Sequence, residues 1–171
     1  LARKSLEYYL AHQKLFSLEE FTDPITELMN RNYGCFVTLK KYGDLRGCIG
    51  TIIPSHSLAQ HVLENVIKSA VEDPRFPPVT TEESAELNIE ITILSPPHPV
   101  DSYKQIEIGK HGMILEKNGY RALFLPQVAT EQGWDLATTL SHLAMKAGLD
   151  QNAWQSDCNF QIFEGLEFNE S

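Results

Sequence analysis

The dipeptide Asn118-Gly119 places the tightest constraint on the fold, because it lies between two short apolar runs. The run GMILEK precedes it, and the run YRALFLP follows it. Asn-Gly is typical of a two-residue type I′ turn, which needs positive φ angles at both central residues. The sequence therefore predicts a β-hairpin here, with Glu116 paired to Arg121 across the strands.

Further strands are predicted on both sides of this hairpin. A second hairpin is expected where GCFVTL and LRGCIGTII flank a short turn that contains Gly43. The alternation of Ile89, Ile91 and Ile93 with polar residues predicts a half-buried strand. The tail CNFQIFEGLEF predicts another strand, and SPPHPV predicts a polyproline-like corner.

Helices are expected between the strands. Residues 6–16 have an amphipathic pattern, and a helical turn is expected after Pro24. Ser57 is expected to cap a helix that Pro74 terminates, and Asp135 to cap a helix that ends before Gly148. Hairpins mixed with helices, without regular βαβ units, predict an α+β fold with an antiparallel sheet and flanking helices.

Length and charge limit the class of protein. A chain of 171 residues is expected to form one domain, over residues 1–171, which could divide into two subdomains. No apolar run approaches the roughly 20 residues that a membrane span needs. The net charge of −9 argues against nucleic acid and anionic membrane surfaces as partners.

The cysteines indicate a cellular compartment, and the first residues indicate where the sequence begins within the natural protein. An odd count of three cysteines without regular spacing indicates a reducing compartment, so a cytoplasmic protein is expected. The first residues lack an initiator Met, and the sequence is therefore expected to begin inside the natural protein.

The segment Arg46-Gly47-Cys48-Ile49-Gly50 is the first candidate site. On a regular strand Arg46 and Cys48 would share a face, and a guanidinium beside a thiol favours the nucleophilic thiolate. The alternative is that Cys48 is a small buried residue and that the glycines mark a bulge. A disulfide between Cys35 and Cys48 is not expected, because a turn centred on Gly43 separates the two sulfurs.

The segment Asp73-Pro74-Arg75-Phe76 is the second candidate. A carboxylate at the expected C-terminus of a helix is disfavoured by the helix dipole, so Asp73 needs a cationic partner. Arg75 or Arg46 is expected to supply it, either within a binding site or as a structural ion pair. Glu90 lies in mid-strand and is expected to face solvent, unless that face lines a cleft.

His111, between Gly109-Lys110 and Gly112, is the third candidate. It is expected to be exposed in a turn, either solvated or available for general acid–base chemistry. His56 and His61 are five positions apart and do not share a helical face, and no common metal or nucleotide motif occurs. No metal and no cofactor are therefore expected.

The LRGCIG segment (residues 45–50) resembles the signature of the AMMECR domain family. The similarity continues over nearly the whole chain and is carried by the segments DPRFPP, SPP after residue 94, IGKHG, LPQVA with GWD, and KAGL. Within the family, the chain is similar to the bacterial and archaeal set called AmmeMemoRadiSam system protein A. The resemblance implies two unequal lobes around a cleft, with the signature residues gathered near it.

The resemblance also implies partners, namely a MEMO-like protein and a radical-SAM protein. The function expected first is that of a binding or adaptor subunit for these two proteins. The alternative is an enzyme with a cleft that binds a small polar or anionic molecule. In that enzyme Cys48 would be the nucleophile or redox group, and His111 would carry protons. Arg46 would be both a catalytic and a substrate-binding residue, and substrate would also be bound by Asp73, Arg75 and Glu90.

Overall fold

The computed structural model describes residues 1–170, which divide into two compact units. Unit 1 comprises residues 1–94 and residues 166–170, and unit 2 comprises residues 95–165. The sequence of unit 2 is therefore inserted into that of unit 1. The predicted α+β class is confirmed, and the cleft between lobes stays a prediction.

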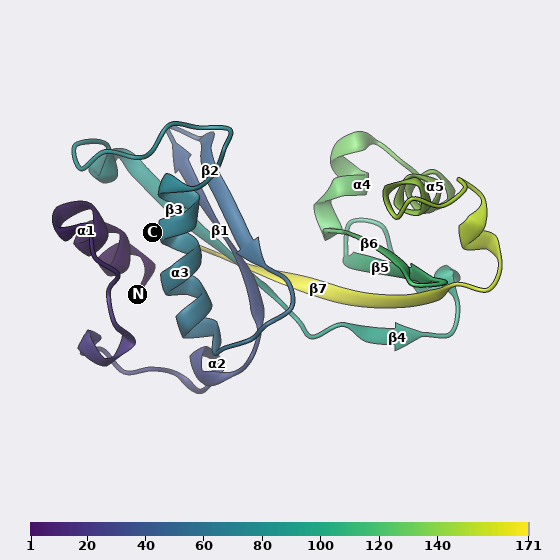
Figure 1. Cartoon of the computed structure of the whole chain (residues 1–171), viewed down its shortest axis with the longest axis horizontal. Helices are drawn as coiled ribbons and strands as arrows, with labels where there is room; N and C mark the ends of the chain where they lie inside the picture. The colour runs from purple at the N-terminus through teal and green to yellow at the C-terminus, as the bar shows by residue number, and fades with distance from the viewer. Residues whose placement is uncertain (171) are drawn as a thin grey trace. The chain divides into compact units, whose positions relative to one another are not determined.

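Five α-helices and seven strands occur in residues 1–170 (Figure 1). The helices are α1 (Ala2–His12), α2 (Glu27–Asn30), α3 (Leu58–Val71), α4 (Pro126–Gln132) and α5 (Leu136–Lys146). The strands are β1 (Gly34–Lys41), β2 (Asp44–Thr51), β3 (Leu87–Leu94), β4 (His98–Val100), β5 (His111–Lys117), β6 (Tyr120–Phe124) and β7 (Asn159–Asn169). No helix in this part of the chain has both the length and the apolarity that a membrane crossing requires.

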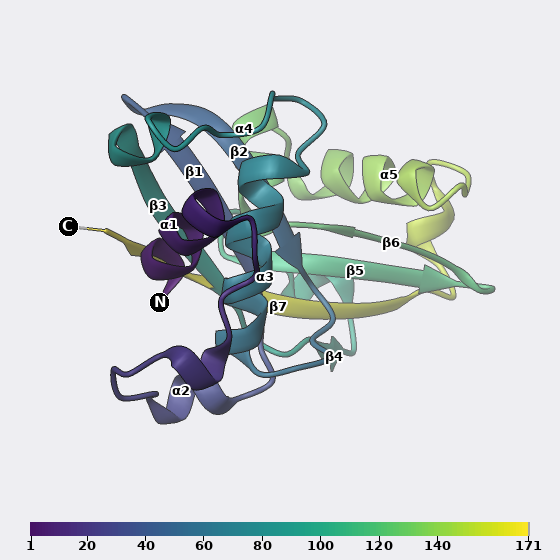
Figure 2. The same ribbon diagram turned by 60° about the vertical axis from the view of Figure 1, so that its left-hand side comes forward.

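In unit 1, β1 pairs with β2 on one side and with β3 on the other, both antiparallel. Helix α3 covers one face of these strands, and α1 packs against α3 (Figure 2). Side chains of α1, α3 and the facing side of the strands form the core of the unit. As predicted, Ser57 caps α3, since its hydroxyl accepts the Gln60 N–H.

The β1–β2 hairpin contains one irregularity that fixes the orientation of its residues. Its turn, Tyr42-Gly43, has positive φ angles of 53° and 91°. Arg46 is an extra residue in β2, because Lys40 pairs with Leu45 whereas Leu39 pairs with Gly47. This β-bulge shifts the register by one residue from Gly47 onwards.

Helix α3 lies unusually close to β2 because Gly47 has no side chain. A Cβ at Gly47 would overlap the backbone carbonyl of Ser69. The Ser69 hydroxyl accepts the Ile49 N–H at 2.8 Å and donates to the Val37 carbonyl at 2.7 Å. A side chain of the helix therefore bridges two paired strands, and the strand positions depend on the helix.

The two ends of unit 1 are joined by an ion pair. Arg3 of α1 donates to both carboxylate oxygens of Glu170, at 3.1 and 2.6 Å. The same carboxylate accepts the Ile89 N–H of β3 at 3.0 Å. One residue after β7 therefore holds α1 and β3 together.

In unit 2, β7 lies between β4 and β5, and β5 also pairs with β6, all antiparallel. The Asn118-Gly119 turn has φ angles of 51° and 82°, and the predicted pairing of Glu116 with Arg121 is confirmed. Asp135 caps α5 as predicted, with its carboxylate accepting the Thr138 N–H. The core of this unit consists of apolar residues from α5 and the strands.

Two local predictions for the chain need correction, and one helix was not predicted. Helix α1 begins at Ala2 and ends at His12, four residues before the predicted end, because Gln13 adopts a left-handed conformation. The segment SPPHPV contains a strand, β4, because residues 98–100 pair with β7. Helix α4 was not predicted, although Pro126 occupies its first position, where proline is favoured.

We expect Gly47→Ala to lower the free energy of unfolding by about 3 kcal/mol, because the new methyl group forces α3 away from β2. Urea denaturation would measure the change. Asp44→Ala, at an exposed position in the same strand, is the control and should change it by less than about 0.5 kcal/mol. Equal stability of the two variants would contradict the close helix–strand contact.

Candidate functional site

The LRGCIG segment lies on β2, and Cys48 belongs to a row of side chains that crosses three strands. Thr38 pairs with Cys48 on one side and with Glu90 on the other. Paired residues point to the same face of a sheet, and this face is opposite to α3 because Val37 and Gly47 face the helix. We call it the outer face.

The outer face combines a thiol, a hydroxyl and an ion pair. The Sγ atom of Cys48 lies 3.2 Å from Oγ1 of Thr38, and Cys48 is half-buried. Glu90 pairs with Lys40 at 2.8 Å, and both side chains keep partial access to solvent. The predicted position of Glu90 in mid-strand is confirmed, and its carboxylate is paired rather than free.

Arg46 directs its charge away from Cys48. Its Nε and Nη2 atoms donate to the two carboxylate oxygens of Glu83 at 2.8 and 2.9 Å, which lowers the pKa of Glu83. Its third nitrogen, Nη1, is buried without a hydrogen-bond partner among the described residues. The expected Arg46–Cys48 contact is therefore absent from residues 1–170, because Arg46 is the bulge residue and Glu83 binds its guanidinium.

Asp73 binds the backbone of β2 at Cys48. Its buried carboxylate accepts the Cys48 N–H at 2.9 Å and the Arg75 N–H at 3.1 Å. It also accepts two bonds from the Arg75 guanidinium, at 2.9 and 2.7 Å. Arg75, followed by these backbone N–H groups, lowers the pKa of Asp73 far below the ordinary range, so Asp73 is ionised at neutral pH.

Arg75, rather than Arg46, is the cation that contacts Cys48. Its Nη2 atom donates to the Cys48 carbonyl at 3.4 Å, and its side chain is 54% exposed. The expectation that Asp73 has an arginine partner is confirmed, with Arg75 in that role. Both polar groups of the Cys48 backbone are thus bound by the Asp73–Arg75 pair.

The environment of His111 differs from the exposed turn that the sequence predicted. His111 is buried, not exposed in a turn, because strand β5 begins at this residue. Its Nδ1 accepts the Glu107 N–H at 3.0 Å, and Nε2 lies 3.7 Å from a carboxylate oxygen of Glu164. His111 belongs to unit 2, whereas the other candidate residues belong to unit 1.

The three cysteines are free. Cys35 pairs with Thr51 and points into the core, whereas Cys48 lies on the outer face, so the predicted separation of their sulfurs is confirmed. Burial raises the pKa of Cys35 to about 11. Within residues 1–170, no group of three or more His, Cys, Asp or Glu side chains could hold a metal ion.

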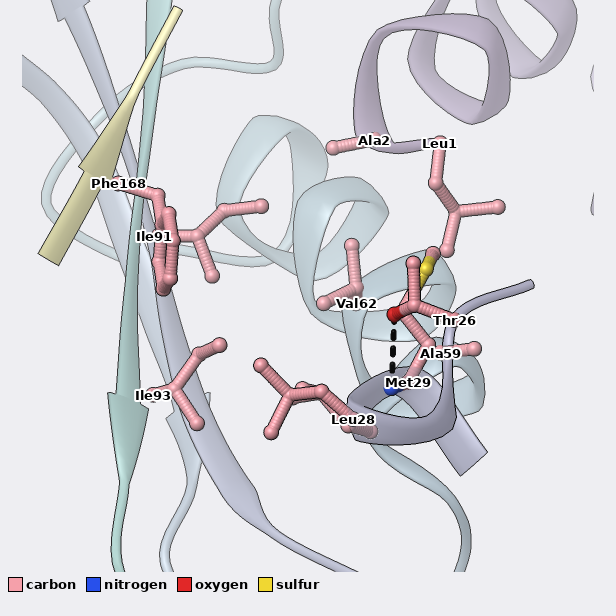
Figure 3. Close-up of a pocket in the computed structure, with 11 residues that line it drawn as sticks. Leu1, Ala2, Thr26, Leu28, Met29, Ala59, Val62, Ile91, Ile93 and Phe168 are labelled. Atoms are coloured by element: carbon pink, nitrogen blue, oxygen red, sulfur yellow. Dashed lines mark hydrogen bonds between the residues drawn. The ribbon is translucent and has the colours of Figure 1, made fainter. Parts of the chain in front are cut away.

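An apolar cavity of about 290 Å³ lies elsewhere in unit 1 (Figure 3). Ile91, Ile93 and Phe168 line one side of it, and Leu28 and Val62 line the other. None of the candidate site residues lines this cavity. Because its lining has almost no polar group, it does not extend the site around Cys48.

The sequence did not indicate two residues that complete the site, Glu83 and Thr38. Glu83 is 37 positions from Arg46 and sits in a short 3-10 turn, so no local pattern could connect them. Thr38 follows from the hairpin register, but only once the bulge at Arg46 is known.

The fold and the site define an α+β protein in which the Asp73–Arg75 pair binds the backbone of the LRGCIG strand. The chain belongs to the AMMECR1 family, which matches residues 1–168. It is 42% identical to Protein MJ0810 of Methanocaldococcus jannaschii, over 97% of this chain and 87% of that protein. Protein MK0488 of Methanopyrus kandleri is also 42% identical, over 99% of this chain and 85% of that protein.

A solved structure supports the assignment. The chain is similar to the crystal structure of the uncharacterized protein PH0010 from Pyrococcus horikoshii, with a TM-score of 0.80 and 36% identity. The match covers 99% of this chain and 88% of that chain. The resemblance that the LRGCIG segment indicated is therefore confirmed over the whole domain.

Asp73→Asn should lower the free energy of unfolding by about 1–2 kcal/mol at neutral pH, since the amide loses the charged bonds from Arg75. The lowered pKa of Asp73 means that its stabilisation is present above about pH 4 and is lost as the pH falls through the folded-state pKa. Urea titrations of both proteins at several pH values would measure this. A difference that stays constant down to about pH 2 would contradict an ionised Asp73.

Iodoacetamide should alkylate Cys48 in the folded protein and Cys35 only after unfolding. Cys48 is half-buried on the outer face, whereas Cys35 is fully buried with a raised pKa. Peptide mass spectrometry at about pH 8 would compare the two sites, and we expect at least a tenfold difference in rate. Labelling in urea is the control, in which both cysteines should react.

Proposed function

We propose that the chain is a binding or adaptor subunit that works with a MEMO-like protein and a radical-SAM protein. One observation carries this proposal: the charged groups beside the LRGCIG segment are bound to each other. A catalytic or substrate-binding group needs a free donor or acceptor aimed at its ligand. Arg46 instead donates from two of its nitrogens to Glu83, and its third nitrogen is buried. Asp73 accepts from Arg75 and from the Cys48 N–H of β2.

These internal bonds support a role in holding a surface in shape. The Arg46–Glu83 pair fixes the start of the bulge, and the Asp73–Arg75 pair binds the backbone of Cys48. Separating either pair would leave an unpaired charge on a largely buried carboxylate, so both pairs are held in place. A fixed outer face is suited to recognition, since less conformational entropy is lost on binding.

The partner surface that we propose is the outer face around Thr38. It carries the hydroxyl of Thr38 and the thiol of Cys48, which lie 3.2 Å apart, next to the Lys40–Glu90 ion pair. Such a mixture of half-buried polar groups fits a hydrogen-bonded protein interface. The identity of the partners rests on the family resemblance alone.

Co-expression of the chain with the MEMO-like and radical-SAM proteins should give a complex that survives gel filtration at micromolar concentration. Thr38→Arg should weaken this complex at least tenfold, because a long cation replaces a small hydroxyl at the centre of the outer face. Thr138→Arg, an exposed threonine on α5, is the matched control and should leave binding unchanged. No complex with either partner would overturn the proposal.

A second function, catalysis by Cys48 on a small polar or anionic substrate, is favoured by one contact. The half-buried thiol lies 3.2 Å from the Thr38 hydroxyl, which could donate a hydrogen bond to a thiolate. The exposed Arg75 guanidinium beside Cys48 would attract an anionic group. Here the Asp73–Arg75 pair would position Arg75 for the substrate.

Cys48→Ser separates the two functions. An adaptor should retain partner binding and the output of the three-protein system, because serine preserves the size of the side chain. An enzyme that uses Cys48 should retain partner binding and lose that output at least a hundredfold. Gel filtration would measure partner binding, and an activity assay of the reconstituted three-protein system would measure its output.

A further inference from the structure

His61 lies in the first turns of α3 and binds the loop that joins β2 to the helix. Its side chain is buried, and its Nε2 atom accepts the N–H groups of Ser55 and His56, both at 3.2 Å. These are consecutive backbone amides in the loop of residues 52–57. One ring nitrogen therefore holds both of them.

This arrangement requires a neutral ring with its proton on Nδ1. Nε2 has a free lone pair only in that tautomer. Nδ1 is buried and has no hydrogen-bond partner among the described residues, so the ring gains nothing on that side. The whole polar function of His61 is thus to accept from the loop.

The groups around His61 do not favour a charged ring. Burial, the largest effect, lowers its pKa, and His56 and Lys68 act in the same direction, whereas Glu64 opposes them. The rings of His56 and His61 are 5.8 Å apart. Glu64 is engaged by Gln60 and Lys68, which weakens its effect.

Within residues 1–170, the contacts that the neighbouring elements make with α3 near His61 involve uncharged groups or charges that are already paired. Toward β1 and β2, Asn65 bonds with the carbonyl of Cys35 and the hydroxyl of Thr51, and both are uncharged. On the side of α2, the guanidinium of Arg31 is paired with Glu27. From α1, Ser5 donates to the Leu63 carbonyl.

We propose that His61 is a proton-sensitive latch for the loop of residues 52–57. The neutral ring keeps the loop closed by accepting two amides. Protonation puts a hydrogen on Nε2, so this nitrogen can no longer accept the N–H groups of Ser55 and His56 and faces them as a third donor. It also adds a buried positive charge next to His56, and the loop therefore opens. Because this loop continues directly from β2, acidification loosens the end of the LRGCIG strand, which is a property beyond the proposed function.

Amide hydrogen exchange of the whole chain tests the latch. Protection of the Ser55 and His56 amides, corrected for intrinsic exchange, should fall at least tenfold between about pH 7.5 and about pH 5. In His61→Gln the amide oxygen can accept the same bonds without titrating, so protection should not change with pH. His56→Gln should keep the pH dependence, because His61 is intact. A loss of protection in His61→Gln that equals that of the wild type would overturn the proposal.

Nitrogen NMR of the histidine rings gives a second test that needs no variant. At about pH 7.5 the wild-type spectrum should show His61 with its proton on Nδ1. A proton on Nε2 would exclude it as the acceptor of the two amides and would also overturn the proposal.

Discussion

The β-bulge at Arg46 inserts one residue into β2, and the orientation of the LRGCIG side chains depends on it. A regular ladder from the Tyr42-Gly43 turn would pair Cys48 with Val37, which is fully buried beneath α3. With the extra residue Cys48 pairs with Thr38, and the thiol moves to the outer face. Gly47 then faces the helix, where only a residue without a side chain leaves room for the Ser69 backbone.

The charges near this strand explain why its geometry is stable. Arg46 is bound by Glu83, and Asp73 is bound by Arg75 and two backbone N–H groups. Buried charges destabilise a fold unless they are paired and hydrogen-bonded, and these meet both conditions except at one nitrogen of Arg46. The same pairing removes Arg46 and Asp73 as free catalytic groups, which is why we favour recognition over catalysis.

Local chemistry made part of this structure predictable. The Asn118-Gly119 turn, the Ser57 and Asp135 caps and the alternation in β3 all depend on residues within a few positions of each other. Contacts between distant segments were not predictable. The partner of Arg46, the burial of His111 and the pairing of β4 with β7 depend on which segments the folded chain brings together. Of the site, the sequence indicated the residue types, an arginine partner for Asp73 and, as one alternative, a bulge at the glycines. It did not indicate that the extra residue is Arg46 or that the bulge turns Cys48 to the outer face.

The Glu170 carboxylate binds both Arg3 and Ile89, and this contact affects the order in which the two units can fold during translation. Residues 95–165 form a continuous stretch, so unit 2 has its complete sequence before the last residues of unit 1 are synthesised. In unit 1, α1 and β3 can be joined through Glu170 only after residues 166–170 have been synthesised. During translation, the segment that is inserted can therefore fold ahead of the unit that surrounds it, and the LRGCIG strand belongs to the part that is finished last.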